Sequence, residues 1–287
     1  MTTPTVRTVA LSAGSFRVLE WEGSDRSAIF LHGLTGVAEV WGPTVDVLGD
    51  GRPHSFALDQ RGHGHSPKPT SGYKIGNYER DLVEAIEALK LDRPHLVGHS
   101  MGARVAMFAA ARHPELFRSV TIVDIGPERW KANWVDSVAA FDRLPPSWPS
   151  VEAAVGRAGQ IRPGSSIDAA LAATGSAAAP LRAIAEARLR VNPDGSASWL
   201  ASTDALKQTV IAHRSRGFWP EWSRVSAPAM LVRGELSDEL RVATSSRMRA
   251  MRPDVRFEEL AGVGHNIPLI APTSLAHVLR DFWGKLG

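Results

Sequence analysis

Residues 96–103 spell LVGHSMGA and place a serine between two glycines in the pattern Gly-x-Ser-x-Gly. An apolar run precedes the pattern and an alanine-rich run follows it, so the chain predicts a strand, a sharp turn and a helix. A serine in such a turn has a strained backbone, and the residues two positions away crowd one another, which requires residues as small as Gly98 and Gly102. The hydroxyl then lies at the carboxyl end of a strand, near a helix N-terminus that favours negative charge. We therefore predict Ser100 to be a nucleophile.

A serine hydroxyl is a weak nucleophile at neutral pH and needs a base, together with a third group that holds the base. Of the ten histidines, His265 lies in a glycine-flanked loop directly after the last predicted strand, where its ring can reach over the sheet. We predict it to be the base. The chain order nucleophile, acid, base favours Asp238, just past the strand that ends at Arg233, as the acid. Asp124, which follows the preceding strand, is the alternative acid; otherwise it caps a turn.

Two further loops rich in glycine follow predicted strands. Residues 32–36 (HGLTG) can aim backbone N–H groups into a cleft and so form half of an oxyanion hole, the alternative being a plain strand–helix turn. Residues 59–67 (DQRGHGHSP) contain two histidines and an aspartate, but no fourth ligand is near and the usual metal-ligand spacing is absent. We expect a structural loop held by hydrogen bonds of Asp59 and Arg61, with no metal and no cofactor.

The elements that must position these residues alternate between short apolar runs and amphipathic ones. The pattern predicts an α/β fold, with a mostly parallel eight-stranded sheet, helices on both faces and the site at the carboxyl ends of the strands. The first two strands form an antiparallel hairpin. The expected strands are residues 5–11, 16–21, 28–31, 55–58, the run before Gly98, 120–123, 229–233 and 257–260; the clearest helices are 77–90, the run after Ser100 and the segment that begins at Pro272.

The alternation stops after Gly126. Residues 127–225 hold six of the nine tryptophans, several prolines and an alanine-rich stretch, and their patterns are mainly helical. We interpret this segment as a helical lid inserted into a core domain made of residues 1–126 and 226–287. Most lid aromatics are expected to pack within the lid. The candidates for lining an apolar substrate pocket are His32, Gly33, Trp130, Trp134 and Trp219.

The composition restricts the classes of function. The 287 residues are 44% hydrophobic and 22% charged, with a formal net charge of only +3 and no clustered basic stripe, which argues against nucleic-acid binding. No cysteine is present, so disulfides, thiolate metal sites and a thiol nucleophile are excluded. The first residues do not resemble a signal peptide and no long apolar run predicts a membrane span, so we expect a cytoplasmic protein. The oligomeric state stays open, with a homodimer as one candidate.

Six motifs in a fixed order carry a resemblance to a known family: HGLTG (32–36), DQRGHG (59–64), GHSMG (98–102), VDIGP (123–127), VRGELSDEL (232–240) and GVGHNIP (262–268). With them the chain resembles the α/β-hydrolase superfamily over nearly its whole length. The resemblance implies Ser100 as nucleophile, His265 as base and Asp238 as acid. It also implies an oxyanion hole made by the backbone N–H groups of Leu34 and Met101.

The resemblance also narrows the chemistry. Epoxide hydrolases and haloalkane dehalogenases of this superfamily have an aspartate where this chain has Ser100, and usually a proline where it has Thr35. We therefore expect an acyl-enzyme reaction of water with a small, hydrophobic ester or lactone, without a cofactor. A carbon–carbon bond hydrolase acting on a vinylogous diketone, or a perhydrolase, uses the same residues and is the alternative enzyme. A ligand-binding receptor without activity is the alternative from another class, because a fold does not dictate a function.

Overall fold

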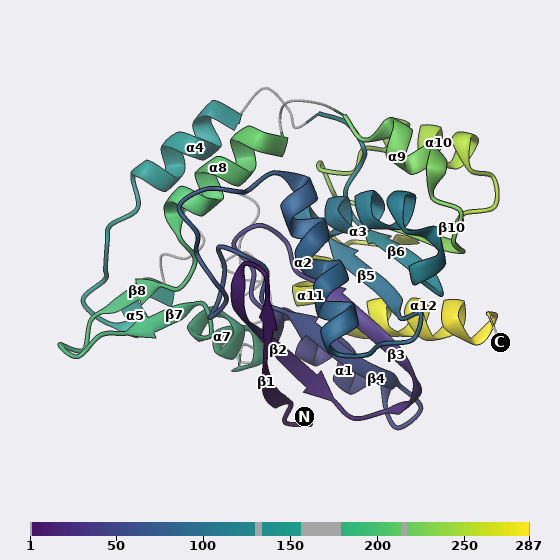
Figure 1. The fold of residues 1–287 in the computed structure, drawn as a ribbon. Helices are drawn as coiled ribbons and strands as arrows, with labels where there is room; N and C mark the ends of the chain where they lie inside the picture. The colour runs from purple at the N-terminus through teal and green to yellow at the C-terminus, as the bar shows by residue number, and fades with distance from the viewer. Residues whose placement is uncertain (1, 130–133, 156–178, 214–216, 287) are drawn as a thin grey trace.

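A computed structural model describes residues 2–129, 134–155, 179–213 and 217–286, without the side chains of 134–137 and 179–181. Its centre is an eight-stranded sheet of order β1-β2-β4-β3-β5-β6-β9-β10 (Figure 1). This confirms the predicted mostly parallel α/β sheet. The strands are β1 (Thr5–Leu11), β2 (Gly14–Trp21), β3 (Ser24–Leu31), β4 (Pro53–Leu58), β5 (His95–His99), β6 (Ser119–Val123), β9 (Ala229–Gly234) and β10 (Arg256–Leu260).

The pairing of the strands brings the carboxyl ends of the central strands together at one edge of the sheet. The first two strands form the predicted antiparallel hairpin, with Leu11 opposite Gly14, and β2 is also antiparallel to β4. Every other pair in this sheet is parallel. β5 lies between β3 and β6, where Gly98 pairs with Leu31 on one side and Ile122 on the other. The residues that follow β3, β5, β6, β9 and β10 therefore meet at the same edge.

Helices cover both faces of the sheet (Figure 1). Buried side chains of α2, α3 and α10 share one apolar cluster with one face, and those of α1 and α12 share another cluster with the opposite face. None of the helices in the described ranges is long and apolar enough to cross a membrane. The helices of these layers are α1 (Gly42–Leu48), α2 (Ile75–Ala88), α3 (Met101–Arg112), α10 (Val242–Met251), α11 (Ile267–Ile270) and α12 (Pro272–Gly284), with 3-10 turns at Ala38–Trp41 and Pro114–Leu116.

The chain between β6 and β9 is mainly helical, as expected, but it also contains a small antiparallel ribbon of β7 and β8. The ribbon forms because Gly195 takes a φ of 81° in a turn closed by the Asn192 N–H donating to the Ser196 carbonyl at 2.8 Å. The elements of this segment are α4 (Trp134–Asp142), α5 (Val151–Val155), α7 (Ala179–Glu186), β7 (Leu189–Val191), β8 (Ala197–Trp199), α8 (Thr203–His213) and α9 (Trp219–Arg224).

The last part of the predicted lid packs on the core. Trp222 of α9 is fully buried in the apolar cluster that also holds Phe108 of α3, together with Phe218 and Val225. The indole Nε1–H of Trp222 donates to the carbonyl of Met248 on α10 at 2.9 Å. Residues 218–225 are therefore anchored to α3 and α10, while the division of the chain at 127 and 225 stays a prediction.

Candidate active site

Ser100 occupies the turn between β5 and α3. Its φ of 52° and ψ of −116° lie outside the regions that L-residues favour. The turn is held on both sides: the Ser100 N–H donates to the Val123 carbonyl of β6 at 3.0 Å, and the Ser100 carbonyl accepts from Ala103 at 3.1 Å. A Cβ atom on Gly98 would overlap the backbone of Gly102. The strained serine and the small residues around it are the features of a nucleophile turn.

Three side chains from distant parts of the sequence form a chain of hydrogen bonds at this edge. Ser100 Oγ lies 2.9 Å from His265 Nε2, and His265 Nδ1 lies 2.8 Å from Asp124 Oδ2. Because an ionised carboxylate only accepts, Nδ1 carries the imidazole proton and Nε2 is left as the acceptor for the serine hydroxyl. The geometry is therefore that of a nucleophile, a base and an acid that orients the base.

The acid in this arrangement is Asp124, the alternative, so the prediction that Asp238 orients His265 is wrong. Asp124 is fully buried directly after β6, and its two oxygens accept from the Gly234 N–H at 2.9 Å, from the Ser237 hydroxyl and from His265. Asp238 is exposed. A buried carboxylate with three donors is held in one position, as an orienting acid must be.

The turn after β9 explains why Asp238 is not the acid. The Ser237 N–H donates to the Gly234 carbonyl and the Leu236 N–H to the Val263 carbonyl, both at 2.9 Å, and this turn directs Ser237 inward. Asp124 and Asp238 both satisfy the expected chain order, so that order does not distinguish them. The sequence reasoning also missed Ser237 and Gly234 as hydrogen-bond donors to Asp124. The sequence signal that could have identified Asp124 as the acid is its position directly after the predicted strand that follows Ser100.

The loop of residues 32–36 lies against the nucleophile. A Cβ atom on Gly33 would lie 3.1 Å from the Cβ atom of Ser100 and 3.1 Å from Nδ1 of His99. Within the described ranges, the backbone N–H groups of Leu34 and Met101 donate to no protein acceptor. Two unused amide donors, one in the loop beside Ser100 and one at the start of α3, are suited to hold an anionic oxygen.

The ring of His32 supports this loop. Nδ1–H donates to the Gly33 carbonyl at 2.8 Å, and Nε2 accepts from the Gln60 N–H at 3.1 Å. Burial lowers the pKa of His32, so the ring is neutral, as these two bonds require. Both ring nitrogens are thus used within the protein, where they shape the loop, and the role of His32 in substrate binding stays a prediction.

His99, which sequence reasoning did not select, holds the loop that carries the base. Its Nε2–H donates to the backbone carbonyl of His265 at 2.9 Å, and the two rings lie 4.9 Å apart. Burial, with a smaller effect of the neighbouring His265, lowers the pKa of His99 to about 3. His99 therefore stays neutral and keeps this hydrogen bond at any pH near neutrality.

Residues 59–67 form the structural loop that the sequence predicted. Asp59 is buried and accepts from the Ala38 N–H at 2.8 Å, the His65 N–H at 3.0 Å and the Arg17 guanidinium at 3.1 Å. The guanidinium of Arg61 pairs with Asp81 through two hydrogen bonds of 2.5 Å. These bonds fix the loop beside residues 32–36.

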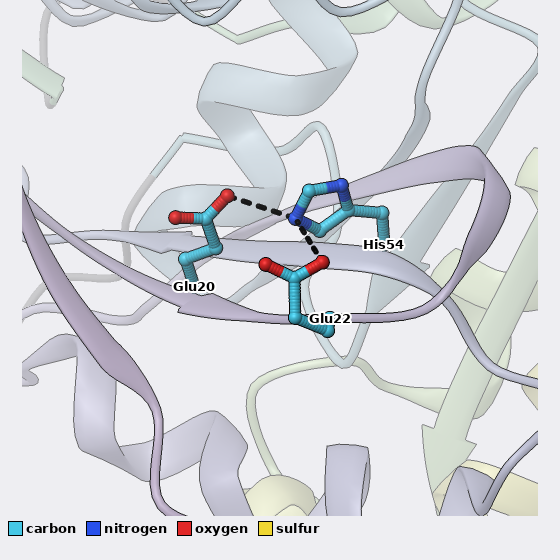
Figure 2. Close-up of side chains that lie close together, drawn as sticks. All are labelled: Glu20, Glu22 and His54. Carbon is cyan, nitrogen blue, oxygen red and sulfur yellow. Dashed lines mark hydrogen bonds and ion pairs between the residues drawn. The ribbon is translucent and has the colours of Figure 1, made fainter.

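Across the ranges that the structure describes, the one group with three clustered metal-type ligands is Glu20, Glu22 and His54 (Figure 2). His54 lies near the start of β4, so the group is at the end of the parallel strands opposite to Ser100. Glu20 already accepts from His54 at 2.8 Å and from Arg7 at 3.2 Å, while the Glu22 side chain is 85% exposed. The contacts within the described protein thus already engage Glu20, and the group lies at the end of the sheet opposite to Ser100.

The predicted tryptophan contacts are placed only in part. Trp130 and the side chain of Trp134 lie outside the described residues. Trp219 is half-buried at the start of α9, where the Arg247 guanidinium lies 4.1 Å from its ring centre. Its described contacts are with α10 and the core cluster, and none joins it to Ser100.

Comparisons with known proteins match most of the chain. A family model described as alpha/beta hydrolase fold matches residues 29–272. The chain is 32% identical over 266 residues to a 2-(acetamidomethylene)succinate hydrolase from Mesorhizobium japonicum, covering 91% of this chain and 89% of that protein. It is 26% identical to an esterase from Mycobacterium tuberculosis, covering 94% and 87%. A solved structure of E-2-(acetamidomethylene)succinate hydrolase matches with a TM-score of 0.84 and 29% identity over 98% of this chain and 99% of that one.

Proposed function

Because the chain belongs to the α/β-hydrolase family, we propose that it is a serine hydrolase that cleaves an ester or lactone of a small substrate through an acyl-enzyme. The observation that carries the proposal is the unbroken hydrogen-bond chain from Ser100 Oγ through His265 to the buried Asp124, at 2.9 and 2.8 Å. Membership of the family does not specify which bond is cleaved, so the proposed ester or lactone bond has to be tested.

In this mechanism the Ser100 hydroxyl attacks the substrate carbonyl carbon while His265 Nε2 takes its proton. The tetrahedral oxyanion accepts from the N–H groups of Leu34 and Met101, each worth about 3 kcal/mol in the transition state. Collapse expels the alcohol, which takes the proton from His265. Water, deprotonated by His265, then attacks the acyl-enzyme and releases the acid. Asp124 stabilises the imidazolium form of His265 in both halves of the cycle.

An enamide is the second candidate substrate, because the Mesorhizobium relative covers nearly the whole chain at 32% identity and its name specifies an acetamido group on a succinate skeleton. The same attack on an acetamido carbonyl gives an acetyl-enzyme and releases the nitrogen side of the substrate. The active-site residues serve both reactions equally, so the substrate pocket must decide between ester and enamide.

The first test is labelling with a fluorophosphonate, followed by mass spectrometry. We expect one adduct, on Ser100, which is lost in Ser100→Ala and kept in Ser223→Ala, a matched change at an exposed serine on α9. Hydrolysis of p-nitrophenyl acetate and butyrate, γ-butyrolactone and an N-acetyl enamide is then compared in the same three proteins. Ester or lactone turnover that Ser100→Ala abolishes supports the proposal.

Three other outcomes would contradict it. Turnover of the enamide alone would transfer the proposal to the second candidate. Activity on a vinylogous diketone without ester turnover would indicate carbon–carbon bond hydrolysis. Tight ligand binding with no adduct and no turnover would indicate a receptor.

A further inference from the structure

Arg188 is a cation near the active-site loops, and the described residues offer it no ion-pair partner. It occupies the turn between α7 and β7, and its Nε atom is shielded from solvent with no hydrogen-bond acceptor. Within the ranges that the structure describes, no carboxylate pairs with its guanidinium. The side chain of Arg188 is partly exposed, and its two terminal nitrogens are not among the buried atoms without a partner, so the open end of the guanidinium faces accessible space.

The backbone of Arg188 is fixed. Its N–H donates to the Ala185 carbonyl at 3.2 Å, and its carbonyl accepts from the Leu200 N–H at 2.8 Å. One turn earlier, Ile184 and Ala185 of α7 are buried in the apolar cluster that also holds Val40 and Ile267. Val40 follows residues 32–36 and Ile267 follows His265, so α7 packs on the same apolar layer that supports these two segments.

The charge of Arg188 acts on two residues of the site. Its positive charge is one of the factors that lower the pKa of His32 and of His99, after the larger effect of burial. These are the residues that support the loop at Gly33 and the loop of His265. Burial likewise lowers the pKa of Arg188 itself to about 10, and no acidic group of the described ranges opposes that effect.

Arg188 is partly buried. A partly buried guanidinium without a counter-ion destabilises a folded chain, because it loses hydration and gains no Coulombic partner. The described side-chain contacts show no structural bond that would offset this penalty. A carboxylate suits this guanidinium best, since two parallel N–H groups at the open end of a guanidinium fit the two oxygens of a carboxylate.

On the basis of the serine-hydrolase function proposed above, we propose that Arg188 binds a carboxylate of the substrate, so that the enzyme selects anionic esters or amides. The substrate then has one carbonyl at Ser100 and a carboxylate at the turn between α7 and β7. Arg188 sets specificity and takes no part in proton transfer.

Paired esters test this inference. The p-nitrophenyl monoesters of succinate and glutarate carry a carboxylate, whereas the p-nitrophenyl esters of butyrate and valerate are neutral and of similar size. A charge-assisted hydrogen bond corresponds to a preference of about ten- to a hundredfold. We expect kcat/KM in the native enzyme to favour the anionic esters by about this factor. In Arg188→Gln the preference should disappear, mainly through KM, with little change for the neutral esters.

The matched control is Arg190→Gln, which removes an exposed arginine two residues further on in β7 and should leave the preference unchanged. Arg188→Lys keeps the positive charge but loses the two parallel N–H donors, so it should retain part of the preference for the anionic esters. Thermal unfolding of each variant shows whether it is folded. Equal activity on both kinds of ester in the native enzyme, or an equal loss on both in Arg188→Gln, would overturn the inference.

A binding measurement separates this inference from the proposed function. Succinate or glutarate should raise the unfolding temperature of Ser100→Ala and of Ser100→Ala with Arg190→Gln. It should not raise that of Ser100→Ala with Arg188→Gln. Inorganic phosphate serves as the competing oxyanion, and an equal shift with phosphate would contradict the choice of a carboxylate. If no ester is hydrolysed but dicarboxylates still bind through Arg188, the proposed ester or lactone chemistry is wrong and the carboxylate site at Arg188 is supported. If dicarboxylates do not bind, the carboxylate site is wrong.

Discussion

The replacement of Asp124 by asparagine is the most direct test of which acid this enzyme uses. In the structure, Asp124 Oδ1 accepts from the Gly234 N–H, while Oδ2 faces His265 Nδ1 and the Ser237 hydroxyl. An asparagine side chain has the same shape but one oxygen only. Because the Gly234 N–H requires that oxygen, the amide NH2 must take the place of Oδ2 and point at His265.

Two donors then face each other, and the imidazole avoids this by moving its proton from Nδ1 to Nε2. A protonated Nε2 cannot accept the proton of Ser100. In a Ser-His-Asp triad this change of tautomer lowers kcat by about 10⁴-fold, or about 5.5 kcal/mol of transition-state stabilisation. We expect a fall of about 10³- to 10⁴-fold in Asp124→Asn, with KM little changed.

The assay is steady-state hydrolysis of p-nitrophenyl butyrate together with the rate of fluorophosphonate labelling, and both should fall together. Urea unfolding shows that the variant is folded. Asp238→Asn, at the exposed aspartate, is the matched control and should lie within about threefold of the native enzyme, as surface substitutions usually do. The reasoning would be refuted if Asp238→Asn lost activity by a hundredfold or more and Asp124→Asn kept it.

Three predictions concern stability, each measured by urea unfolding. Ser100→Gly should abolish activity and raise the free energy of unfolding by about 1 kcal/mol, because glycine tolerates a φ of 52°. Asp81→Ala should lower it by about 3–5 kcal/mol, because the Arg61 guanidinium is left buried without its partner. Burial lowers the pKa of His95 to about 3, whereas an unfolded histidine binds a proton near pH 6.5. Stability should therefore fall as the pH drops below 6.5, and His95→Gln should reduce the loss between pH 7 and 5 by about 2 kcal/mol.

Each of the three stability predictions has its own control or contradicting result. Ser223→Gly replaces an exposed serine of α9 and should give no gain in stability. Glu186→Ala removes an exposed ion-pair partner of Arg182 and should lower the unfolding midpoint much less than Asp81→Ala does. For His95, a native enzyme whose stability is constant from pH 7 to 5 would contradict the assignment of a buried neutral ring.

The order of the elements could be predicted from local pattern alone. Apolar runs such as residues 120–123 and 229–233 are found as β6 and β9 with small changes in their ends. Boundaries were less accurate: the helix predicted from Asn77 begins at Ile75, with Lys74 before its first turn and no side-chain cap. Strand and helix periods are properties of neighbouring residues, whereas the ends of an element depend on what packs against them.

Sequence alone predicted Ser100 as the nucleophile, because Gly98, Ser100 and Gly102 are the local requirement of a strained turn. It also predicted His265 as the base through its place after the last strand, and the structure places the two side chains within hydrogen-bond distance. Only the tertiary structure decided the acid. Asp124 and Asp238 have the same chemistry and both satisfy the chain order. They differ in their surroundings: Asp124 is fully buried with three donors, whereas Asp238 is exposed. That Arg188 has no counter-ion among the described residues is likewise invisible in a sequence, because ion pairing depends on neighbours brought together by folding rather than on residues adjacent along the chain.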